Sequence, residues 1–600
     1  MAFLQQSSLR AGKNRDKTTG RTVGQQYQAV VLLLLSLVTL GGIGSRLAYL
    51  QLVQGDRNRQ LAENNRILLL PRRPARGTIF DRNGQILAGS RLSHSVSIWP
   101  ISLPEDRREA VVGRLAQILD VPAEEIHQRL AQGGYSSNES IPISRGISSA
   151  QATAIAEYAS ELPGVRIEAE AVRDYPHGDL AAHVLGYTGE MDDEELAGRQ
   201  AQGYRLGDVI GKLGVEAAYE SRLRGEWGGQ QVEVDSGGRV IGILGEKPPQ
   251  SGQDIRLTLD LKLQRSAEAA LGDQTGAIVA LDPRDGAILA MVSRPTFDPN
   301  IFSTRISEEQ WASFQSRGNP FVNRAMRSYP PASTFKIVTA TAGIESGKFS
   351  PEVYLPTYPY LSFGGIQFWD WNNAGFGTIG FRTALAMSSD TFFYQVGRAV
   401  GGETLAHWMR QYGFGQKTGI ELAAEEDSGT VPDEAWKQAE IGEGWYLGDT
   451  INTSIGQGFV QTTPLQVAVM FAVPANGGYR VTPHLLLDQE AERDWKESLD
   501  LAPSTLQVLR EGLRQVVSSG TGKVLKDPDL PPISGKSGTA EAPPYQSHTW
   551  FGAYGPSDNP EIVVVAFGEH SGGGGGSFAA PMVKQVLEAY FKADQPKSGS

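Results

Sequence analysis

A serine and a lysine near the middle of the chain have the types and the spacing of a nucleophile and its base. Ser333 and Lys336 are three residues apart in the segment SYPPASTFKIVTATAGIESG, in which two prolines precede a run of good helix formers. The segment predicts a helix that begins near Ser333, with both residues on one face of its first turn. A neutral lysine there could accept the serine proton, and the positive end of the helix dipole would favour the developing negative charge. Alone, the pair is weak evidence, because chance produces Ser-x-x-Lys in many chains.

Two further clusters give this pair a chemical context. A Ser-Ser-Asp at positions 388–390 lies between helical stretches, and a Lys-Ser-Gly-Thr at positions 536–539 lies on an expected strand. A Ser-x-x-Lys, a Ser-x-Asp and a Lys-Ser-Gly in this order resemble the penicilloyl-serine transferase set of penicillin-binding proteins and β-lactamases. Three motifs in the right order, each in its expected local structure, make chance a poor explanation.

The resemblance extends over nearly the whole chain. RGTIFDRNGQILA from Arg76 is similar to the opening of class B enzymes, in which a non-enzymatic pedestal stands in place of a glycosyltransferase domain. Segments similar to the family's transpeptidase domain are GAIVALDPRDGAILAMVSRPTFDPN from Gly276, SIGQGFVQTTPLQ from Ser454 and HTWFGAYG from His548. The Ser-x-Asp form, the following TFFYQ and the Lys-Ser-Gly-Thr resemble the elongation-type group, penicillin-binding protein 2. Division-type relatives usually carry Ser-x-Asn and Lys-Thr-Gly.

The resemblance implies a peptidoglycan D,D-transpeptidase that cross-links stem peptides during cell-wall elongation and is inhibited by β-lactams. Ser333 would attack the carbonyl between the last two D-alanines of a stem peptide, with Lys336 as general base. Ser388 would relay the proton toward the leaving D-alanine, and the backbone N–H groups of Ser333 and Thr539 would form the oxyanion hole. An amine of a neighbouring stem peptide would then resolve the acyl-enzyme.

The same resemblance implies that the third motif binds the substrate. Lys536 would supply positive charge, and the hydroxyls of Ser537 and Thr539 would hold the terminal carboxylate. Gly538 would leave room for the substrate to lie along the strand as an added strand.

The second motif departs from many relatives at one position. Asp390, assigned to substrate binding, stands where they have Asn, and a carboxylate near Lys336 favours the charged ammonium, which is a poorer base. This Asp is usual in the elongation-type group, so we expect activity to be kept. The preceding stretch, FWDWNNAGFGTIGFRTALAMSSD, contains no His or Cys. Asp370 alone cannot form the zinc site that some elongation-type enzymes carry there, and we expect neither a metal nor a cofactor.

The other conspicuous residues predict no chemistry. His177 and His183 do not have metal-ligand spacing and are interpreted as ordinary pedestal residues. By family resemblance His548 lies near the site, in a packing or hydrogen-bonding role. Gly572 to Gly576 predict a flexible loop, because no lysine and helix follow to complete a phosphate cradle.

The elements that must position the motifs follow an α+β order. Asn83-Gly84 predicts a hairpin turn between TIF and QILA, and positions 283–286 predict a tight turn between two core strands. Helices dominate from about Ser333 to Val473, after which strand-like runs return. This order predicts an antiparallel sheet with helices packed on it, and the resemblance implies a serine β-lactamase-like domain.

A chain of 600 residues exceeds one ordinary domain, and we expect a multidomain α+β protein. The expected parts are a cytoplasmic tail (1–22), a transmembrane anchor (23–46), an elongated mixed α/β pedestal of the penicillin-binding protein dimerisation type (47–254), a transpeptidase domain (255–593) and a flexible tail (594–600).

The anchor is expected from one uncharged segment, Val23 to Ser45. As a helix it would be about 35 Å long, enough to cross a hydrocarbon core of about 30 Å. The alternative is a cleaved signal peptide, but no convincing cleavage site follows the segment. Basic residues before the segment favour a cytoplasmic N-terminus. The catalytic domain would then be periplasmic, on a single-pass protein of the bacterial inner membrane.

Composition and the resemblance together limit the partners. The net charge of −12 argues against nucleic acid, and the absence of cysteine excludes disulfides and thiolate metal sites. The expected partners are stem peptides, β-lactams and a RodA-type membrane glycan polymerase. Gly41, Gly42 and Gly44 would permit close helix contact with that polymerase, although membrane helices are commonly rich in glycine.

Two other functions stay open at this point. One is a hydrolase of the same superfamily, either a D,D-carboxypeptidase or a β-lactamase-like protein. The other is a non-catalytic scaffold that activates a glycan polymerase. The intact motifs argue against the scaffold, and the long pedestal argues against the β-lactamase.

Overall fold

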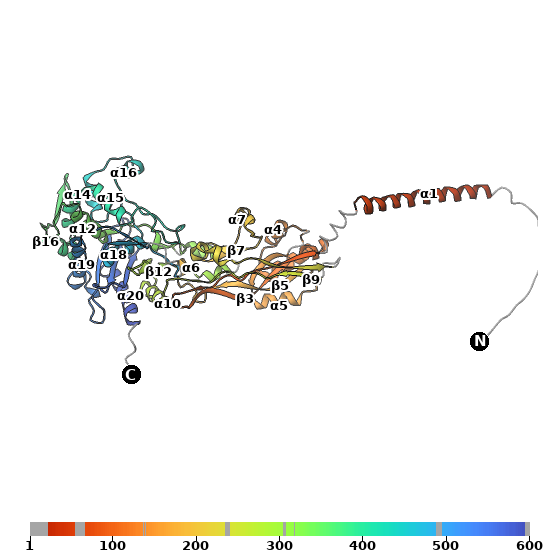
Figure 1. Ribbon diagram of the computed structural model, residues 1–600, viewed down its shortest axis with the longest axis horizontal. Helices are drawn as coiled ribbons and strands as arrows, with labels where there is room; N and C mark the ends of the chain where they lie inside the picture. The colour runs from red at the N-terminus through yellow and green to blue at the C-terminus, as the bar shows by residue number, and fades with distance from the viewer. Residues whose placement is uncertain are drawn as a thin grey trace, which may run out of the picture. The chain divides into compact units, whose positions relative to one another are not determined.

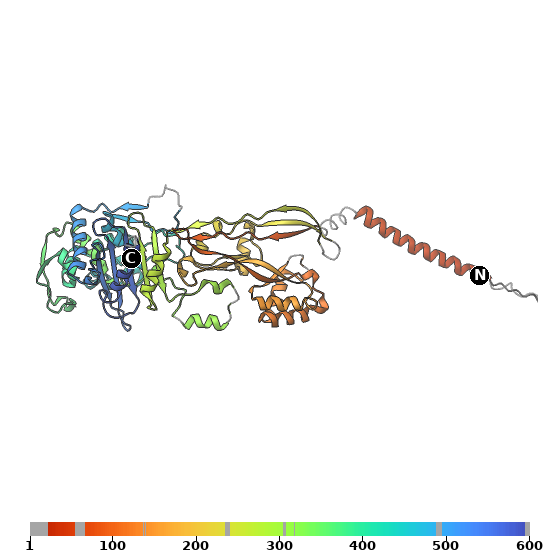
Figure 2. The same ribbon diagram turned by 90° about the horizontal axis from the view of Figure 1, so that it is seen from below.

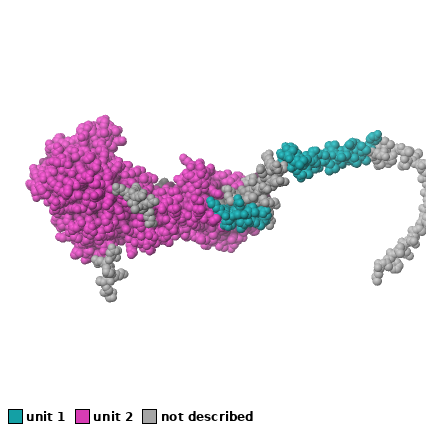
Figure 3. All heavy atoms as spheres, viewed as in Figure 1, with its two compact units in different colours: residues 1–71, 229–247 teal, residues 72–228, 248–600 magenta. Residues whose placement is uncertain are grey.

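The computed structural model describes residues 22–54, 67–135, 137, 140–234, 240–303, 306, 308–316, 318–487 and 495–593. The chain divides into two compact units, residues 1–71 with 229–247 and residues 72–228 with 248–600 (Figure 3). The expected N-terminal tail lies outside the described residues up to position 21, and the expected C-terminal tail lies outside them entirely.

The smaller unit contains a long apolar helix and most of a three-stranded sheet. Helix α1 covers Thr22–Ala48, and the π-helical turn η1 follows at Tyr49–Val53. The stretch Tyr27–Val53 contains an 18-residue window that is strongly apolar and not buried. It is therefore long and apolar enough to cross a membrane. The sheet has the order β1-β8-β9, with β1 at Ile67–Arg72, β8 at Gly228–Val234 and β9 at Val240–Lys247.

The first half of the larger unit is organised around one long strand, β3. Strand β3 pairs in antiparallel fashion with β2, β4 and β5, and β2 also pairs in parallel with β10 (Figure 2). The strands of this half are β2 (Ile79–Phe80), β3 (Ile86–Ile98), β4 (Ile141–Ile147), β5 (Val165–Asp174), β6 (Thr188–Glu190), β7 (Val209–Gly211) and β10 (Ile255–Arg256). Its helices are η2 (Pro100–Ser102), η3 (Glu105–Arg107), α3 (Arg108–Leu119), α4 (Ala123–Gly133), α5 (Ser149–Glu157), α6 (Ala182–Leu185), α7 (Asp193–Arg199), η4 (Gln200–Gln202), α8 (Gly214–Ala218) and α9 (Glu220–Leu223).

The second half of the larger unit contains a five-stranded antiparallel sheet in the order β12-β11-β21-β20-β19. The strands of this half are β11 (Gly276–Leu281), β12 (Ile288–Arg294), β13 (Tyr354–Pro356), β14 (Tyr360–Phe363), β15 (Ile366–Trp369), β16 (Thr378–Gly380), β17 (Tyr479–Val481), β18 (Lys496–Ser498), β19 (Ser534–Ala540), β20 (His548–Gly555) and β21 (Ile562–Gly568). Its helices are α10 (Leu261–Leu271), η5 (Pro299–Ser303), α11 (Glu308–Ser316), η6 (Arg324–Met326), η7 (Ala332–Phe335), α12 (Lys336–Glu345), α13 (Phe381–Met387), α14 (Asp390–Val400), α15 (Gly402–Gln411), α16 (Glu434–Glu440), α17 (Leu447–Thr453), α18 (Pro464–Asn476), α19 (Pro503–Ser518), η8 (Lys523–Leu525) and α20 (Ala579–Ala593).

Helices cover both faces of this sheet, so its strands are apolar on both sides (Figure 1). In β11, Ala277 and Val279 join the core beneath α12, α14 and α18. The alternating residues Ile278 and Ala280 join the core beneath α10 and α20. Alternation of side chains along a strand makes this division between two cores possible. The expected sheet flanked by helices is confirmed.

Both predicted turns are present. Gly84 has a φ of +81° between β2 and β3, where the Asp81 N–H donates to the carbonyl of Gln85. Gly286 has a φ of +88° between β11 and β12, and a Cβ there would lie 2.4 Å from the Thr482 carbonyl oxygen. Glycine is required at both positions by conformation and, at the second, also by space.

Candidate active site

Ser333 lies on a tight turn that raises it out of the core. The turn η7 covers Ala332–Phe335, and the α-helix itself begins at Lys336, three residues later than the sequence predicted. The Lys336 N–H donates to the Ser333 carbonyl, and such backbone bonds between residues three apart define the tighter 3₁₀ form. The Thr334 hydroxyl donates to the Pro331 carbonyl over 2.6 Å. Ser333 is partly exposed, whereas Ala332 and Thr334 on either side of it are buried.

Lys336 and Lys536 converge on one hydroxyl, that of Ser388. Nζ of Lys336 donates to Oγ of Ser388 over 3.3 Å and to its carbonyl oxygen over 2.7 Å. Nζ of Lys536 donates to the same Oγ over 2.8 Å. Lys336 also pairs with Asp390, with 2.6 Å between Nζ and Oδ1. The first, second and third motifs of the sequence therefore meet at a single atom.

Ser388 adopts a left-handed backbone conformation between two helices. It is the C-cap of α13, with φ 55° and ψ 37°, and the next residue, Ser389, is the N-cap of α14. A residue other than glycine in this region is strained by about 1–2 kcal/mol, so its surroundings must hold it there. The conformation places its carbonyl oxygen and its hydroxyl against the same ammonium group of Lys336.

Both lysines are fully buried, a position that lysine side chains rarely occupy. Lys536 lies on β19, and burial, followed by the neighbouring charge of Lys336, lowers its pKa well below the ordinary value, with Asp390 opposing the shift. Desolvation disfavours the charged form of a lysine, and a nearby like charge adds to that effect. An anion bound beside Lys536 would restore the charged form.

The strand that carries the third motif is an edge of the sheet. Among the residues that the structure describes, β20 is the one strand that pairs with β19. A Cβ at Gly538 would lie 3.2 Å from the Pro331 carbonyl oxygen and 3.2 Å from Cγ2 of Thr334, so the strand passes close to η7. An unpaired edge next to Ser333 can accept an extended peptide as one more strand.

Thr521, which the sequence did not single out, and Gly575 of the glycine run support the hydroxyls of this strand. Thr521 and Ser537 share a hydrogen bond of 2.8 Å between their hydroxyl oxygens. The Gly575 N–H donates to Oγ1 of Thr539 over 3.2 Å. A Cβ on Gly575 would lie 2.4 Å from the Gly538 carbonyl oxygen, so this part of the expected flexible loop packs against β19. Composition alone did not reveal that contact, because a glycine run also suits a free loop.

The histidines take structural positions. His548 is buried, and its Nδ1 accepts the His570 N–H over 3.1 Å. Burial, with the charge of His570, lowers the pKa of His548 to about 4. His183 is also buried, bonds the Pro320 carbonyl and has its pKa lowered to about 4 by burial. In the part of the chain that the structure describes, no group of three or more His, Cys, Asp and Glu residues could hold a metal ion.

Together these residues provide the groups that acyl transfer to a serine requires. A partly exposed hydroxyl stands at a helix start, beside two buried lysines joined through a second hydroxyl and beside an open strand edge. The lysines and Ser388 can pass a proton between them, and the edge can hold a peptide that ends in a carboxylate.

Comparisons with known proteins cover the whole of this arrangement. The model of the penicillin binding protein transpeptidase domain matches residues 276–588, and that of the penicillin-binding protein dimerisation domain matches residues 71–257. The peptidoglycan D,D-transpeptidase MrdA of Acinetobacter baumannii is 35% identical over 596 residues, which cover 95% of this chain and 87% of that protein.

Two solved structures are similar in fold and in sequence. The penicillin-binding protein 2 in complex with MreC from Helicobacter pylori has a TM-score of 0.80 and 27% identity, covering 88% of this chain and 99% of that one. A chain of a peptidoglycan synthase complex, described as coordinating polymerization and crosslinking, has a TM-score of 0.70 and 32% identity, covering 95% of this chain and 100% of that one.

Proposed function

Because this chain belongs to the class B penicillin-binding proteins, and within them to the penicillin-binding protein 2 group, we propose that it is a peptidoglycan D,D-transpeptidase acting through an acyl-enzyme on Ser333. The observation that carries the proposal is the hydroxyl of Ser388, which accepts hydrogen bonds from both Lys336 and Lys536. This contact links the first and third motifs beside a partly exposed serine, an arrangement that general protein packing does not require.

In the first half-reaction the Ser333 oxygen forms a bond with the carbonyl carbon between the two terminal D-alanines. Its proton passes to neutral Lys336, and the backbone N–H groups of Ser333 and Thr539 stabilise the oxyanion. The bond from that carbon to nitrogen then breaks. The departing amine takes a proton through Ser388, which the lysines reach on either side, and free D-alanine leaves.

In the second half-reaction an amine of a neighbouring stem peptide attacks the acyl-enzyme. The amine gives up a proton along the same route in reverse, the new amide bond forms, and the bond to the Ser333 oxygen breaks as that oxygen regains a proton. The two stem peptides are then cross-linked, and the enzyme is restored.

Substrate binding falls to β19 and to Asp390. Lys536 attracts the terminal carboxylate of the donor peptide, and the Ser537 and Thr539 hydroxyls donate to it. Gly538 lets the peptide approach the strand closely. Asp390 fixes Nζ of Lys336 before substrate arrives, with 2.6 Å between Oδ1 and Nζ.

The rest of the chain places this chemistry at the membrane. We propose a cytoplasmic tail at 1–22, an anchor at 23–46, a pedestal at 47–254, a periplasmic transpeptidase domain at 255–593 and a free tail at 594–600. The apolar helix supports the anchor. The resemblance to a chain of a peptidoglycan synthase complex supports a RodA-type glycan polymerase as partner in cell elongation.

A time course with a fluorescent penicillin tests the function. A transpeptidase forms a covalent penicillin adduct that hydrolyses slowly, so the label stays on the protein. A β-lactamase-like protein would hydrolyse the adduct and release the label quickly. A non-catalytic scaffold would take up no label at all. Durable labelling of the wild-type protein supports the proposal, and either of the other two outcomes contradicts it.

A further inference from the structure

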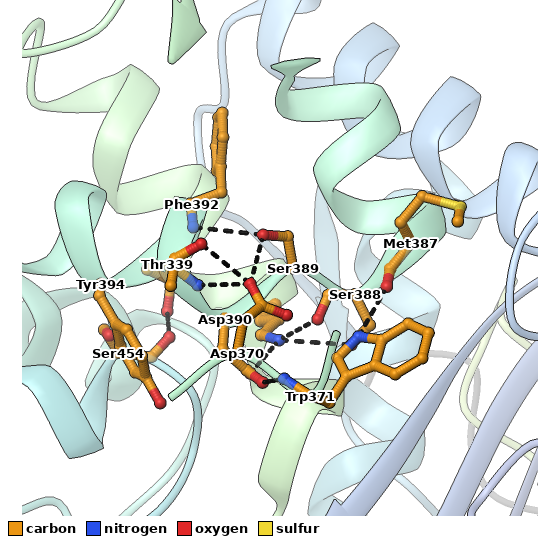
Figure 4. Close-up of polar contacts among 12 residues, drawn as sticks. Thr339, Asp370, Trp371, Met387, Ser388, Ser389, Asp390, Phe392, Tyr394 and Ser454 are labelled. Carbon is orange, nitrogen blue, oxygen red and sulfur yellow. Dashed lines mark hydrogen bonds and ion pairs between the residues drawn. The ribbon is translucent and has the colours of Figure 1, made fainter. Parts of the chain in front are cut away.

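Asp370 and Trp371, directly after β15, surround the loop that carries Ser388 (Figure 4). Neither residue bonds Ser388 itself. Their hydrogen bonds to this loop go instead to the residues before and after it, at 387, 389, 390 and 391. We call these two residues and the bonds that they make the Asp370–Trp371 clamp.

Asp370 provides the buried half of the clamp. Its side chain is 2% exposed, and its Oδ2 accepts hydrogen bonds from the Ser389 hydroxyl over 2.8 Å and from the Thr391 N–H and hydroxyl over 2.9 Å each. A buried carboxylate needs such donors, and hydrogen bonds to a charged acceptor are stronger than neutral ones. The Thr391 N–H belongs to the first turn of α14, where the helix dipole also favours negative charge.

Trp371 provides the exposed half of the clamp. Its backbone N–H donates to Oδ2 of Asp390 over 3.3 Å, and its Nε1 donates to the Met387 carbonyl over 3.0 Å. Asp390 thus accepts from Trp371 with one oxygen and from Lys336 with the other. The clamp therefore contacts the partner of the catalytic lysine directly.

The backbone conformation of Ser388 explains why the residues on both sides of it need to be held in place. That residue has a φ of +55°, and both of its hydrogen bonds to Lys336 depend on where its backbone lies. A left-handed serine does not hold this conformation by itself. Fixing the residues on both sides leaves the Ser388 hydroxyl free for the two lysines.

We propose that Asp370 is a positioning residue that acts through Ser389 and Thr391, and with Trp371 holds Ser388 and Asp390 in register with Lys336 and Lys536. The proposal rests on the proposed function, because its effect is on the acylation of Ser333. It predicts that loss of the clamp slows bond formation more than it weakens the initial binding of the β-lactam, because Asp370 is buried and reaches the site only through Ser389 and Thr391.

Stopped-flow acylation of the full-length protein in detergent by a fluorescent penicillin separates these steps. Varying the penicillin concentration gives the acylation rate constant, the dissociation constant of the initial complex and the labelled fraction at the end point. Asp370→Ala should lower the rate constant by about 10-fold or more, since misplacement by about 1 Å can reduce a rate up to 10²-fold. The dissociation constant should change less than about two-fold, and all of the protein should still become labelled in time.

A matched pair of variants keeps the test independent of folding. Thr391→Ser retains the hydroxyl that donates to Asp370 and should keep the wild-type rate constant, whereas Thr391→Val has the same shape without the hydroxyl and should be slower. Asn373→Ala, at an exposed neighbour of the clamp, should behave as wild type.

The possible results distinguish the two proposals. An unchanged rate constant in Asp370→Ala overturns the clamp, and so does a lower labelled fraction at an unchanged rate constant, because that result indicates a purely structural residue. Equal rates for Thr391→Ser and Thr391→Val also contradict it. If the wild-type protein takes up no label, the proposed function fails instead.

Discussion

Two buried ionic clusters of the larger unit differ in how their charges balance. In the pedestal, Arg76 and Arg173 meet Glu216 and Glu220, two cations and two anions. At the candidate active site, Lys336 and Lys536 meet Asp390, and among the described residues this is the one carboxylate within ion-pair distance of either lysine. We call the first set the pedestal cluster and the second the active-site cluster.

In the pedestal cluster, the positive and negative charges are balanced. Both oxygens of Glu216 pair with arginines, Oε1 with Nε of Arg173 and Oε2 with Nε of Arg76, each over 2.6 Å. Burial opposes the charge of Glu216, but the two arginines outweigh it and lower the pKa of that carboxyl. A planar guanidinium suits such fixed, charge-balanced contacts.

In the active-site cluster, positive groups outnumber negative ones. Its two lysines share one carboxylate and one hydroxyl, and burial lowers the pKa of Lys536 well below its ordinary value. A substrate carboxylate would supply the missing negative charge. Balanced charges therefore mark the part of the fold that carries structure, and unbalanced charges mark the part that binds and reacts.

Removing one partner from the pedestal cluster should give the largest effect. Glu216→Gln leaves two buried arginines without their shared carboxylate, which typically lowers the free energy of unfolding by about 3–5 kcal/mol. Urea unfolding in detergent measures the loss. Glu226→Gln, at an exposed acid in the same half of the unit, serves as the control and should unfold as wild type does.

The acylation rate constant of the folded Glu216→Gln protein should stay within about two-fold of wild type, a change of about 0.4 kcal/mol. The reason is that Glu216 bonds residues of the pedestal and none of the active-site cluster. A much slower rate in fully folded protein would contradict the separation of the two clusters.

The opposite pattern is expected for the active-site cluster. Lys336→Ala should slow acylation by about 10²-fold or more, the usual scale for loss of a general base. The free energy of unfolding should fall by less than in Glu216→Gln, because the substitution also removes one of two adjacent buried lysines. Acylation at the wild-type rate would remove Lys336 from the mechanism.

A smaller effect is expected where the glycine loop touches β19. Gly575→Ala would bring a Cβ to 2.2 Å from the Trp550 carbonyl oxygen, so the strand that binds the substrate must shift. We expect acylation to slow by about 10-fold, as for a misplacement below 1 Å. The control is Gly574→Ala, where the nearest atom lies 3.7 Å away and no change is expected. Equal rates for both variants would show that the loop does not position β19.

A pH dependence of stability is expected at a half-buried acid, Glu425. Burial raises the pKa of this carboxyl from 4.5 to about 7, and the Gly214 N–H, 2.7 Å away, opposes the shift. The protonated form is favoured in the folded state, so its stabilising contribution is complete below pH 4.5 and is lost as pH rises through about 7.

Thermal unfolding of wild type and Glu425→Gln between about pH 4 and pH 8 tests this dependence, because the window spans both pKa values. The midpoint of the wild-type protein should fall relative to that of the variant as pH rises. Parallel midpoints over the whole window would contradict the raised pKa.

The sequence predicted the reacting residues of the active-site cluster better than the residues that hold them in position. Ser333, Lys336, Ser388 and the 536–539 segment were recognisable because acyl transfer restricts their types and order. Asp370 was considered only as a metal ligand, since hydrogen bonds to Ser389 and Thr391 depend on how distant segments pack. Local sequence patterns predict helix starts, turns and the alternation of side chains along strands, but they do not predict contacts between distant segments.

The pedestal cluster shows the same limit. Arg76 begins the segment that resembles class B enzymes, whereas Glu216 and Glu220 lie in two short helices, α8 and α9, whose sequences show no marked pattern. Nothing in either segment alone indicates that these side chains meet, because only the folded chain brings them together.

The most direct test of the central claim is to identify the atom that the β-lactam acylates. Full-length protein would be incubated with benzylpenicillin and digested, and the modified peptide sequenced by tandem mass spectrometry, with Ser333→Ala treated in parallel. We predict one adduct on the wild-type protein, on Ser333, and none on the variant, whose fold should be unchanged because only a partly exposed hydroxyl is removed. An adduct on another residue, or equal labelling of Ser333→Ala, would contradict the account.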